Sequence, residues 1–237
     1  MQTLAVVDPL AEVARLEGVP SAVAAALAAV DAVLRDRGLR IIDAETQSAA
    51  LAASATASAE LTGDPQRWLV GALRLSAELV GLAGLVRVAP AQALARLHAV
   101  VGRGVLADED LGRVGDRPGV AQRLHGLSRL LTLPTQASAV VLGAVVHAEV
   151  ATVAPFADAN GLVARAAERL VLIGAGIDPR AVIVIEAGHR ASGSAYDRGL
   201  RGYADGGTNG VRDWVLHSAQ ALARGAEQSP AGRSRSS

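Results

Sequence analysis

Residues 154–165 lie between two apolar helical segments and read Ala154-Pro155-Phe156-Ala157-Asp158-Ala159-Asn160-Gly161-Leu162-Val163-Ala164-Arg165. Such a loop is a natural anion site where it enters a helix, because free backbone N–H groups and the positive end of the helix dipole converge there. Asn160 and Gly161 tolerate backbone conformations that turn successive amides inward. Asp158 could hold a divalent metal ion against phosphate oxygens, and Arg165 can reach back toward the same place. The stretch therefore predicts a phosphate site, with a capped helix that binds no ligand as the alternative.

Helical periodicity dominates the chain on both sides of this loop. Within residues 20–38, for example, apolar residues recur at intervals of three and four, which is typical of an amphipathic helix. Further helices are predicted over residues 43–61, from 64, from 90, and over 120–133, 135–153, 161–173 and 210–225, with two shorter ones after residue 176. Residues 101–119 carry glycines, an acidic patch and a proline, which predict a long loop or a short hairpin. Strand signals are confined to residues 182–185, so the predicted fold class is all-α.

The composition excludes several classes of function. The chain has 23 basic and 23 acidic residues, so no net charge draws it to nucleic acid or to an acidic membrane. It has no cysteine, which removes disulfides, thiolate nucleophiles and cysteine-ligated zinc. It has no lysine either, which removes Schiff-base chemistry and the Walker-type phosphate lysine. Catalysis would therefore depend on histidine, carboxylates, hydroxyls or a metal ion, and arginine could still bind phosphate.

The length and the apolar pattern indicate one compact domain with a helical N-terminal extension. The chain has 237 residues, of which 51% are hydrophobic, and no apolar run approaches the eighteen or so residues of a membrane helix. We predict an N-terminal helical region over residues 1–63, a core over 64–228 and a disordered tail over 229–237. The N-terminus lacks the basic start of a signal peptide, so we expect a cytoplasmic protein without a membrane or nucleic-acid partner.

The loop resembles the signature of the Fic (Fido) family, H-P-F-x-[D/E]-G-N-G-R-x-x-R, and we call residues 154–165 the signature loop. Six residues occupy matching places, namely Pro155, Phe156, Asp158, Asn160, Gly161 and Arg165. The likeness covers about residues 90–225, including a histidine seven residues ahead of the loop and Trp214 in the last helix. The resemblance implies a Fic-type helical bundle related to protein AMP-transferases. It also implies nucleotide binding at Asn160, Gly161 and Arg165, with ATP as the nucleotide and Mg²⁺ held by Asp158.

The chain departs from the family pattern at the positions that carry catalysis and phosphate binding. The family's histidine, the general base that deprotonates the target hydroxyl, is Ala154 here, and a methyl group cannot accept a proton. The family's glycine at the start of the phosphate nest is Ala159, and its first arginine is Leu162. A positioned base is worth about two to four powers of ten in rate, so efficient nucleotidyl transfer is not expected.

The histidines of the chain do not replace the missing base. His147 lies two helical turns from Ala154, about 10 Å along the helix axis, which is too far for proton transfer. The remaining histidines show no spacing typical of metal ligands. We therefore interpret all five as ordinary packing or surface residues, and we expect Phe156, the only phenylalanine, to be buried beneath the loop.

A second family feature is implied near the N-terminus. Many members carry an inhibitory helix with the pattern [S/T]-x-x-x-E-[G/N], whose glutamate pairs with the second arginine of the signature. Residues 56–60 match the first five places, and Leu61 replaces the expected glycine or asparagine. We therefore predict that Glu60 pairs with Arg165, with Glu168 as the local alternative partner at i+3.

These observations favour a degenerate Fic-domain protein that is catalytically silent or nearly so. It would act as a binding or regulatory module toward a protein partner whose identity the sequence leaves open. The alternative is an atypical Mg²⁺-dependent nucleotidyl or phosphoryl transferase, or a hydrolase of such adducts. In that case Asp158 would hold the metal ion, and Glu60 or a substrate group would handle the proton. The fold alone does not choose between the two hypotheses.

Overall fold

The computed structural model describes residues 8–35 and 42–233 of the chain. The regular elements of these residues are α1 (Pro9–Val13), α2 (Val19–Arg35), α3 (Ala44–Glu60), α4 (Pro65–Leu82), α5 (Leu85–Val88), α6 (Pro90–Gly102), the 3-10 helix η1 (Asp108–Asp110), α7 (Val120–Thr132), α8 (Ala139–Val153), α9 (Asn160–Gly174), α10 (Ile185–Ala191), α11 (Ser194–Ala204), α12 (Thr208–Glu227) and α13 (Pro230–Arg233). The only β pairing in these residues is an isolated bridge between Arg103 and Leu106. The predicted all-α fold class is therefore confirmed.

Local capping signals set the starts of two helices where the sequence places them. The side chain of Asp43 accepts a hydrogen bond from the backbone N–H of Thr46 at the start of α3. Asp64 does the same for the N–H of Arg67, and Pro65 occupies the first turn of α4. The predicted end of the first long helix at Gly38 lies outside the described residues.

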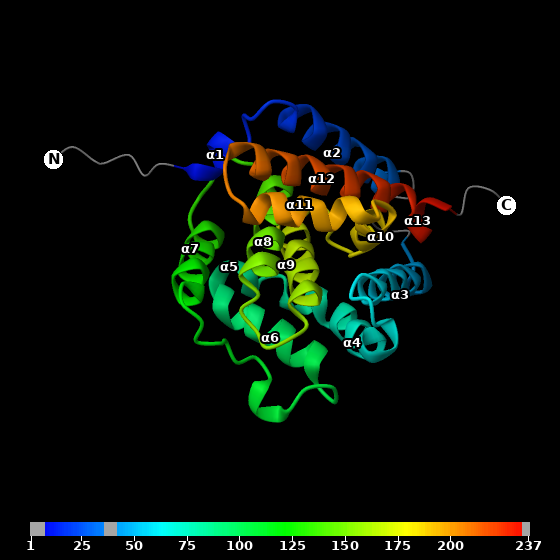
Figure 1. The fold of residues 1–237 in the computed structure, drawn as a ribbon. Coiled ribbons are helices and arrows are strands. Elements are labelled where there is room, and N and C mark those ends of the chain that lie inside the picture. The colour runs from blue at the N-terminus through cyan, green and yellow to red at the C-terminus, as the bar shows by residue number, and fades with distance from the viewer. Residues whose placement is uncertain (1–7, 36–41, 234–237) are drawn as a thin grey trace.

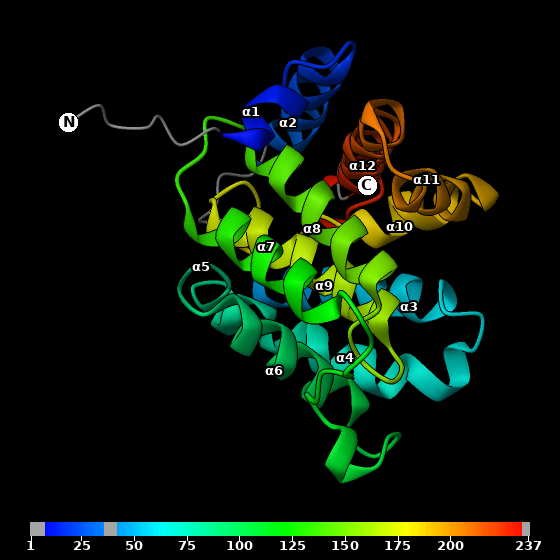
Figure 2. The same ribbon diagram turned by 60° about the vertical axis from the view of Figure 1, so that its left-hand side comes forward.

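Helices α8 and α9 form the centre of the molecule (Figure 1). They pack against each other, with α12 against α8 and with α4 and α6 against α9. Figure 2 shows the same pair between α10 to α12 on one side and α4 to α6 on the other. Every residue of α9 from Leu162 to Ile173 is buried, including three charged ones. A helix buried on all sides needs an internal partner for each charge, and this requirement shapes the site described below.

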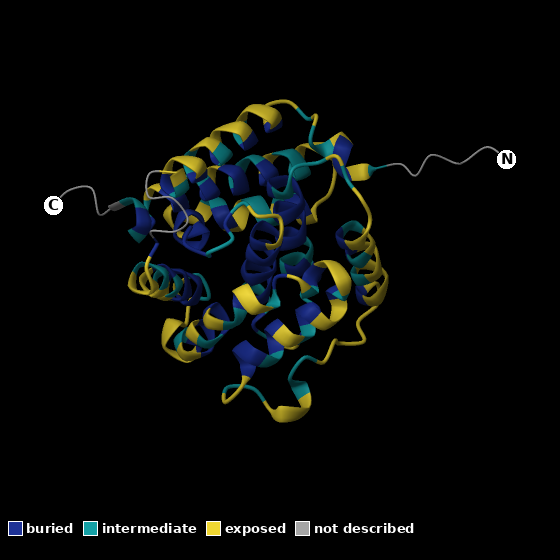
Figure 3. Ribbon diagram, turned by 180° about the vertical axis from the view of Figure 1, so that it is seen from behind, coloured by how far each residue is buried: buried dark blue, intermediate teal, exposed yellow. Residues whose placement is uncertain are grey.

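The N-terminal helices belong to the same hydrophobic core. Helix α2 packs against α12, and α3 packs against α4 and α10. Buried residues of α2 and α3 join those of α8, α9 and α12 in one apolar cluster. Figure 3 shows this burial at the centre of the molecule, with exposed residues on the outer faces of the helices. No helix among the described residues is both long and apolar enough to cross a bilayer.

Residues 182–185 do not form a strand, although they are β-branched and buried. The carboxylate of Asp178 accepts the backbone N–H groups of Val182 and Ile183, both at 2.9 Å. A side chain therefore satisfies the donors that a strand partner would otherwise satisfy, and α10 begins at Ile185.

The prediction of a disordered tail is wrong for residues 229–233. Ser229 is buried and donates from Oγ to the carbonyl of Val182 at 2.7 Å, and Pro230–Arg233 form α13. Ala231 also joins the core. Composition alone misses this because the segment is ordered by contacts with α2 and α3. Residues 234–237 lie outside the described residues.

Candidate functional site

The signature loop takes the backbone shape of a helix-to-helix turn with two left-handed residues. Ala154 caps the end of α8 at φ 45°, and Ala159 precedes α9 at φ 58°. Each such conformation costs a residue with a Cβ about 1–2 kcal/mol. Ala159 thus adopts the conformation that the family's glycine would adopt more easily, and the loop keeps the shape without the residue best suited to it.

Asn160 and Phe156 close the loop on itself. The Asn160 side chain accepts the backbone N–H of Phe156 and donates to its carbonyl, both at 2.9 Å. The Phe156 ring is 5% exposed and stacks on His98 of α6, with ring centroids 4.2 Å apart. The predicted burial of Phe156 is confirmed. The amide of Asn160, predicted to bind nucleotide, is hydrogen-bonded within the loop.

Asp158, the predicted metal ligand, has two partners within the protein. One carboxylate oxygen accepts the N–H of Ala159 at 2.6 Å, and the other forms an ion pair with Arg67 of α4 at 3.0 Å. Both side chains of the ion pair are partly exposed. A divalent ion at Asp158 would therefore have to displace or face an arginine, so the surroundings fit Mg²⁺ poorly.

Arg165 is folded inward against α3. It is 2% exposed, and it donates from Nε to Ser58 Oγ and from Nη2 to the Ser58 carbonyl, both at 2.8 Å. Its Nη1 donates to the Tyr196 hydroxyl at 3.0 Å. A Cβ added to Gly161 would lie 3.2 Å from Nη1, so this glycine makes room for the guanidinium. The arginine thus caps the carboxyl end of α3, where helix carbonyls lack partners.

The predicted pairing of Glu60 with Arg165 is wrong. Glu60 forms its ion pair with Arg190 of α10, and both side chains are substantially exposed. Glu60 lies two positions after Ser58, which turns their side chains about 200° apart around the helix axis. Because Ser58 faces α9, Glu60 points away from it. The alternative pairing with Glu168 is also absent, since that carboxylate binds histidines.

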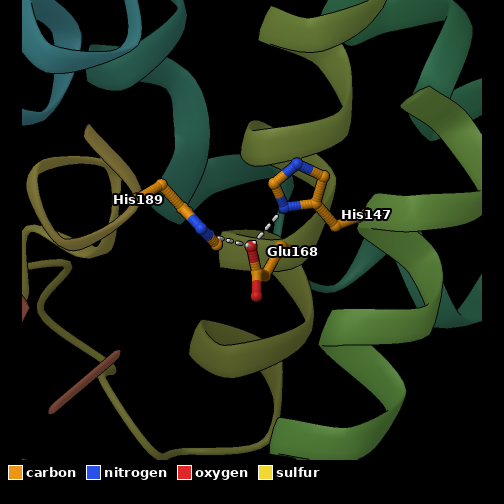
Figure 4. Close-up of side chains that lie close together, drawn as sticks. All are labelled: His147, Glu168 and His189. Carbon is orange, nitrogen blue, oxygen red and sulfur yellow. Dashed lines mark hydrogen bonds and ion pairs between the residues drawn. The ribbon is translucent and has the colours of Figure 1, made fainter. Parts of the chain in front are cut away.

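A second group of buried polar residues, His147, Glu168 and His189, comes together in the interior (Figure 4). One oxygen of Glu168 lies 2.6 Å from His147 Nδ1 and 3.0 Å from His189 Nε2. The three side chains come from α9, α8 and α10, and each is at most 1% exposed. We call them the histidine–glutamate cluster. Both histidines are buried, and they also share one carboxylate, a contact that the interpretation of ordinary packing residues did not include.

The outer atoms of the histidine–glutamate cluster are held as well. His147 Nε2 lies 2.9 Å from the Tyr196 hydroxyl, which links the cluster to Arg165. His189 Nδ1 lies 3.2 Å from Nε2 of His217, and Ser218 Oγ donates to the second oxygen of Glu168. A continuous chain of hydrogen bonds therefore runs from Ser58, beside the signature loop, to the partly exposed His217.

Burial sets the protonation states of these residues. It lowers the pKa of His147 to about 4, although the Glu168 carboxylate favours the charged imidazole. Burial and the neighbouring His189 lower the pKa of His217 to about 3. Burial alone would raise the pKa of Glu168, but attraction and hydrogen bonds from His147 and His189 outweigh it and hold that pKa below its usual value. At neutral pH the cluster thus contains an ionised carboxylate beside a neutral His147.

Little in the sequence points to the histidine–glutamate cluster. Glu168 is 21 residues from each histidine, a separation without meaning in helical or strand periodicity. The sequence signal that could have indicated the cluster is a polar residue at a helical position where an apolar residue is expected. Only the packing of α8, α9 and α10 brings the three together.

Comparisons with known proteins agree with the architecture. No family model matches the chain, and no curated protein sequence matches it. Among solved structures, a Fic family protein from Desulfovibrio desulfuricans G20 is similar, with a TM-score of 0.65 at 17% sequence identity. The alignment covers 96% of this chain and 76% of that protein. At this identity the likeness concerns the fold, and the chain therefore has a Fic-like, all-α fold.

Proposed function

We propose that this chain is a degenerate Fic-fold protein that does not transfer nucleotide groups and acts as a binding or regulatory module. The observation that carries the proposal is the placement of Arg165. In the resemblance it is the arginine left to bind phosphate, yet it is buried and donates to Ser58 and Tyr196. Bidentate binding of a phosphate needs N–H donors on the guanidinium that are free to face the phosphate. Freeing them would leave buried acceptors unsatisfied, which is costly.

The neighbouring positions support the same proposal. Leu162 is buried and has no donor, and Asp158 is paired with Arg67. At the position of the missing base, Arg117 donates to the carbonyls of Val153, at 2.8 Å, and of Ala154. An arginine cannot accept a proton at neutral pH. The groups next to Ala154 therefore supply a cation where proton abstraction would need a base.

Titration of the purified protein with ATP, with and without Mg²⁺, tests the proposal. We expect no saturable binding heat and no transfer of label from ATP to the protein itself or to proteins of a lysate. Ala154→His alone should leave labelling at background, because Leu162 has no side-chain donor and Arg165 is buried with each guanidinium nitrogen already hydrogen-bonded inside the protein. Magnesium-dependent ATP binding together with covalent labelling would instead support an atypical nucleotidyl or phosphoryl transferase. A cytoplasmic location and a protein partner remain part of the proposal and can be tested by fractionation and affinity capture.

A further inference from the structure

The histidine–glutamate cluster has the composition of a metal site. His147 Nδ1, Glu168 Oε2 and His189 Nε2 all lie within 4.8 Å of one another. They come from three different helices and point toward a common place (Figure 4). Two imidazoles and one carboxylate are the donors that bind zinc in several enzyme sites and iron in others. Calcium and magnesium prefer oxygen donors, so the set favours a transition metal.

The outer hydrogen bonds hold each donor as in a protein metal site. Metal-binding histidines nearly always engage their second nitrogen with a carboxylate, carbonyl or other polar group, which fixes the ring orientation. Here Tyr196 holds the far nitrogen of His147, and His217 holds that of His189. Ser218 holds the far oxygen of Glu168. All three donors are thus supported from behind.

Aromatic packing fixes the two imidazole rings further. Trp214 meets His147 edge-on at 4.9 Å between ring centroids and lies parallel to His189 at 6.0 Å. The indole is fully buried and donates to the carbonyl of Ala144. Neither ring can turn away without disturbing this packing, so the near nitrogens stay directed at Glu168.

Binding of an ion requires a change of tautomer in His147 and His189, a matching change in His217, and a turn of the Tyr196 hydroxyl hydrogen away from His147. Each near nitrogen would offer its lone pair to the ion and carry its hydrogen on the far nitrogen instead. The Tyr196 oxygen has two lone pairs, one for Arg165 Nη1 and one for His147. His217 Nε2 can accept the hydrogen from His189. No proton leaves or enters the protein in this exchange.

We propose that His147, Glu168 and His189 bind one divalent transition-metal ion, with Zn²⁺ as the best-suited ion. Zinc binds imidazole nitrogen and carboxylate oxygen at about 2.0–2.2 Å, which places tetrahedral ligand atoms about 3.4 Å apart. The two observed distances to Glu168 Oε2 are 2.6 and 3.0 Å, so each histidine nitrogen needs to move away from this oxygen by less than about 1 Å. The ion would join buried side chains of α8, α9 and α10. This site is separate from the signature loop and does not depend on the proposed function.

The test uses the full chain after treatment with a chelator and dialysis. Zn²⁺ is added, the protein is desalted, and bound zinc is measured by elemental analysis beside a thermal melt. We expect about one zinc ion per chain and a rise of at least about 5 °C in Tm. Glu168→Gln and His189→Gln should each weaken zinc binding at least about 100-fold, because loss of an outer-shell partner alone costs 10- to 100-fold. His125→Gln, at an exposed histidine of α7, is the matched control and should bind as the parent protein does.

A second measurement covers the case in which a buried variant fails to fold. X-ray absorption of the zinc-loaded parent protein should report two imidazole nitrogens and carboxylate oxygen around the ion. Substoichiometric zinc with no change in Tm would overturn the proposal. Stoichiometric binding that survives in folded Glu168→Gln and His189→Gln, or a spectrum without imidazole, would also overturn it by placing the ion elsewhere.

Discussion

Arg165 donates from all three guanidinium nitrogens to groups inside the protein. Arg165→Ala should therefore lower the free energy of unfolding by about 3 kcal/mol or more, since it leaves a cavity and strands the Ser58 carbonyl. Arg190→Ala removes a partly exposed ion pair with Glu60 and should cost less than about 1 kcal/mol. Denaturant unfolding of both variants measures the difference.

A double-mutant cycle separates this arrangement from the inhibitory pairing of the family. Glu60→Ala and Arg165→Ala should be additive within about 0.5 kcal/mol, because the two side chains have different partners. Glu60 and Arg190, which are in contact, form the matched pair with which this cycle is compared. A coupling energy well above that limit between Glu60 and Arg165 would contradict the partners assigned to them.

Phe156 anchors the signature loop through burial and its stack on His98. Phe156→Ala should cost about 3–5 kcal/mol, which is a large share of the stability of one domain. A thermal melt and a denaturant titration check this loss. Val88→Ala, at a residue 81% exposed, is the control and should change stability by less than about 0.5 kcal/mol. An unchanged melt for Phe156→Ala would place the ring in solvent.

At the scale of the elements, α10 and α12 pack through a glycine. A Cβ on Gly188 would lie 1.9 Å from the carbonyl oxygen of Ala221, a backbone atom that cannot swing aside. Gly188→Ala should therefore force the helices apart and cost about 2 kcal/mol or more. Gly126 of α7 has no atom within 4 Å of its added Cβ, so Gly126→Ala should stabilise the protein by about 0.5–1 kcal/mol. A lower Tm for Gly188→Ala and a higher Tm for Gly126→Ala would confirm this difference between the two glycines, and equal shifts would contradict it.

The same scale explains the change of partner at α3. The helix is rich in alanine and serine, and its buried positions include Ala55, Ser58 and Ala59. Small side chains let α3 lie close to its neighbours, as its alanine content predicts. Which residue then faces Arg165 depends on how the helix is rotated about its axis, and a rotation cannot be deduced from a uniform alanine surface.

At the scale of the whole molecule, buried histidines make stability depend on pH. The pKa of His147 is about 4 in the folded protein and near 6.5 in the unfolded chain. Between these values the unfolded chain binds more protons, so stability rises with pH and is lost as the pH falls from 6.5 through 4. For His147 the loss between pH 7 and pH 5 is about 2 kcal/mol. The lowered pKa of His217 acts in the same direction.

Denaturant unfolding at pH 5, 6 and 7 in the presence of a chelator measures this dependence. His147→Gln should reduce the slope of stability against pH by about one proton in this range. The exposed His125 again supplies the control, since His125→Gln should leave the slope unchanged. Stability that stays level or increases toward pH 5 would contradict the assignment of a neutral, buried His147.

The sequence by itself determined the features that rest on local interactions. Capping at Asp43 and Asp64 and the apolar periodicity predicted most of the helices, because these signals involve residues within one or two turns. The order of residues in the signature loop likewise predicted a Fic-like bundle and the buried Phe156. The loop, the caps and the fold class can therefore be predicted from the sequence.

Only the tertiary structure decided which side chains meet. Arg165 is bound by Ser58 in place of Glu60 because of the rotation of α3 against α9. His147 and His189 converge on Glu168 across 21 residues in each direction, a contact that no local pattern encodes. Such contacts depend on how helices pack against one another, and that packing is set by the fit of all buried side chains together.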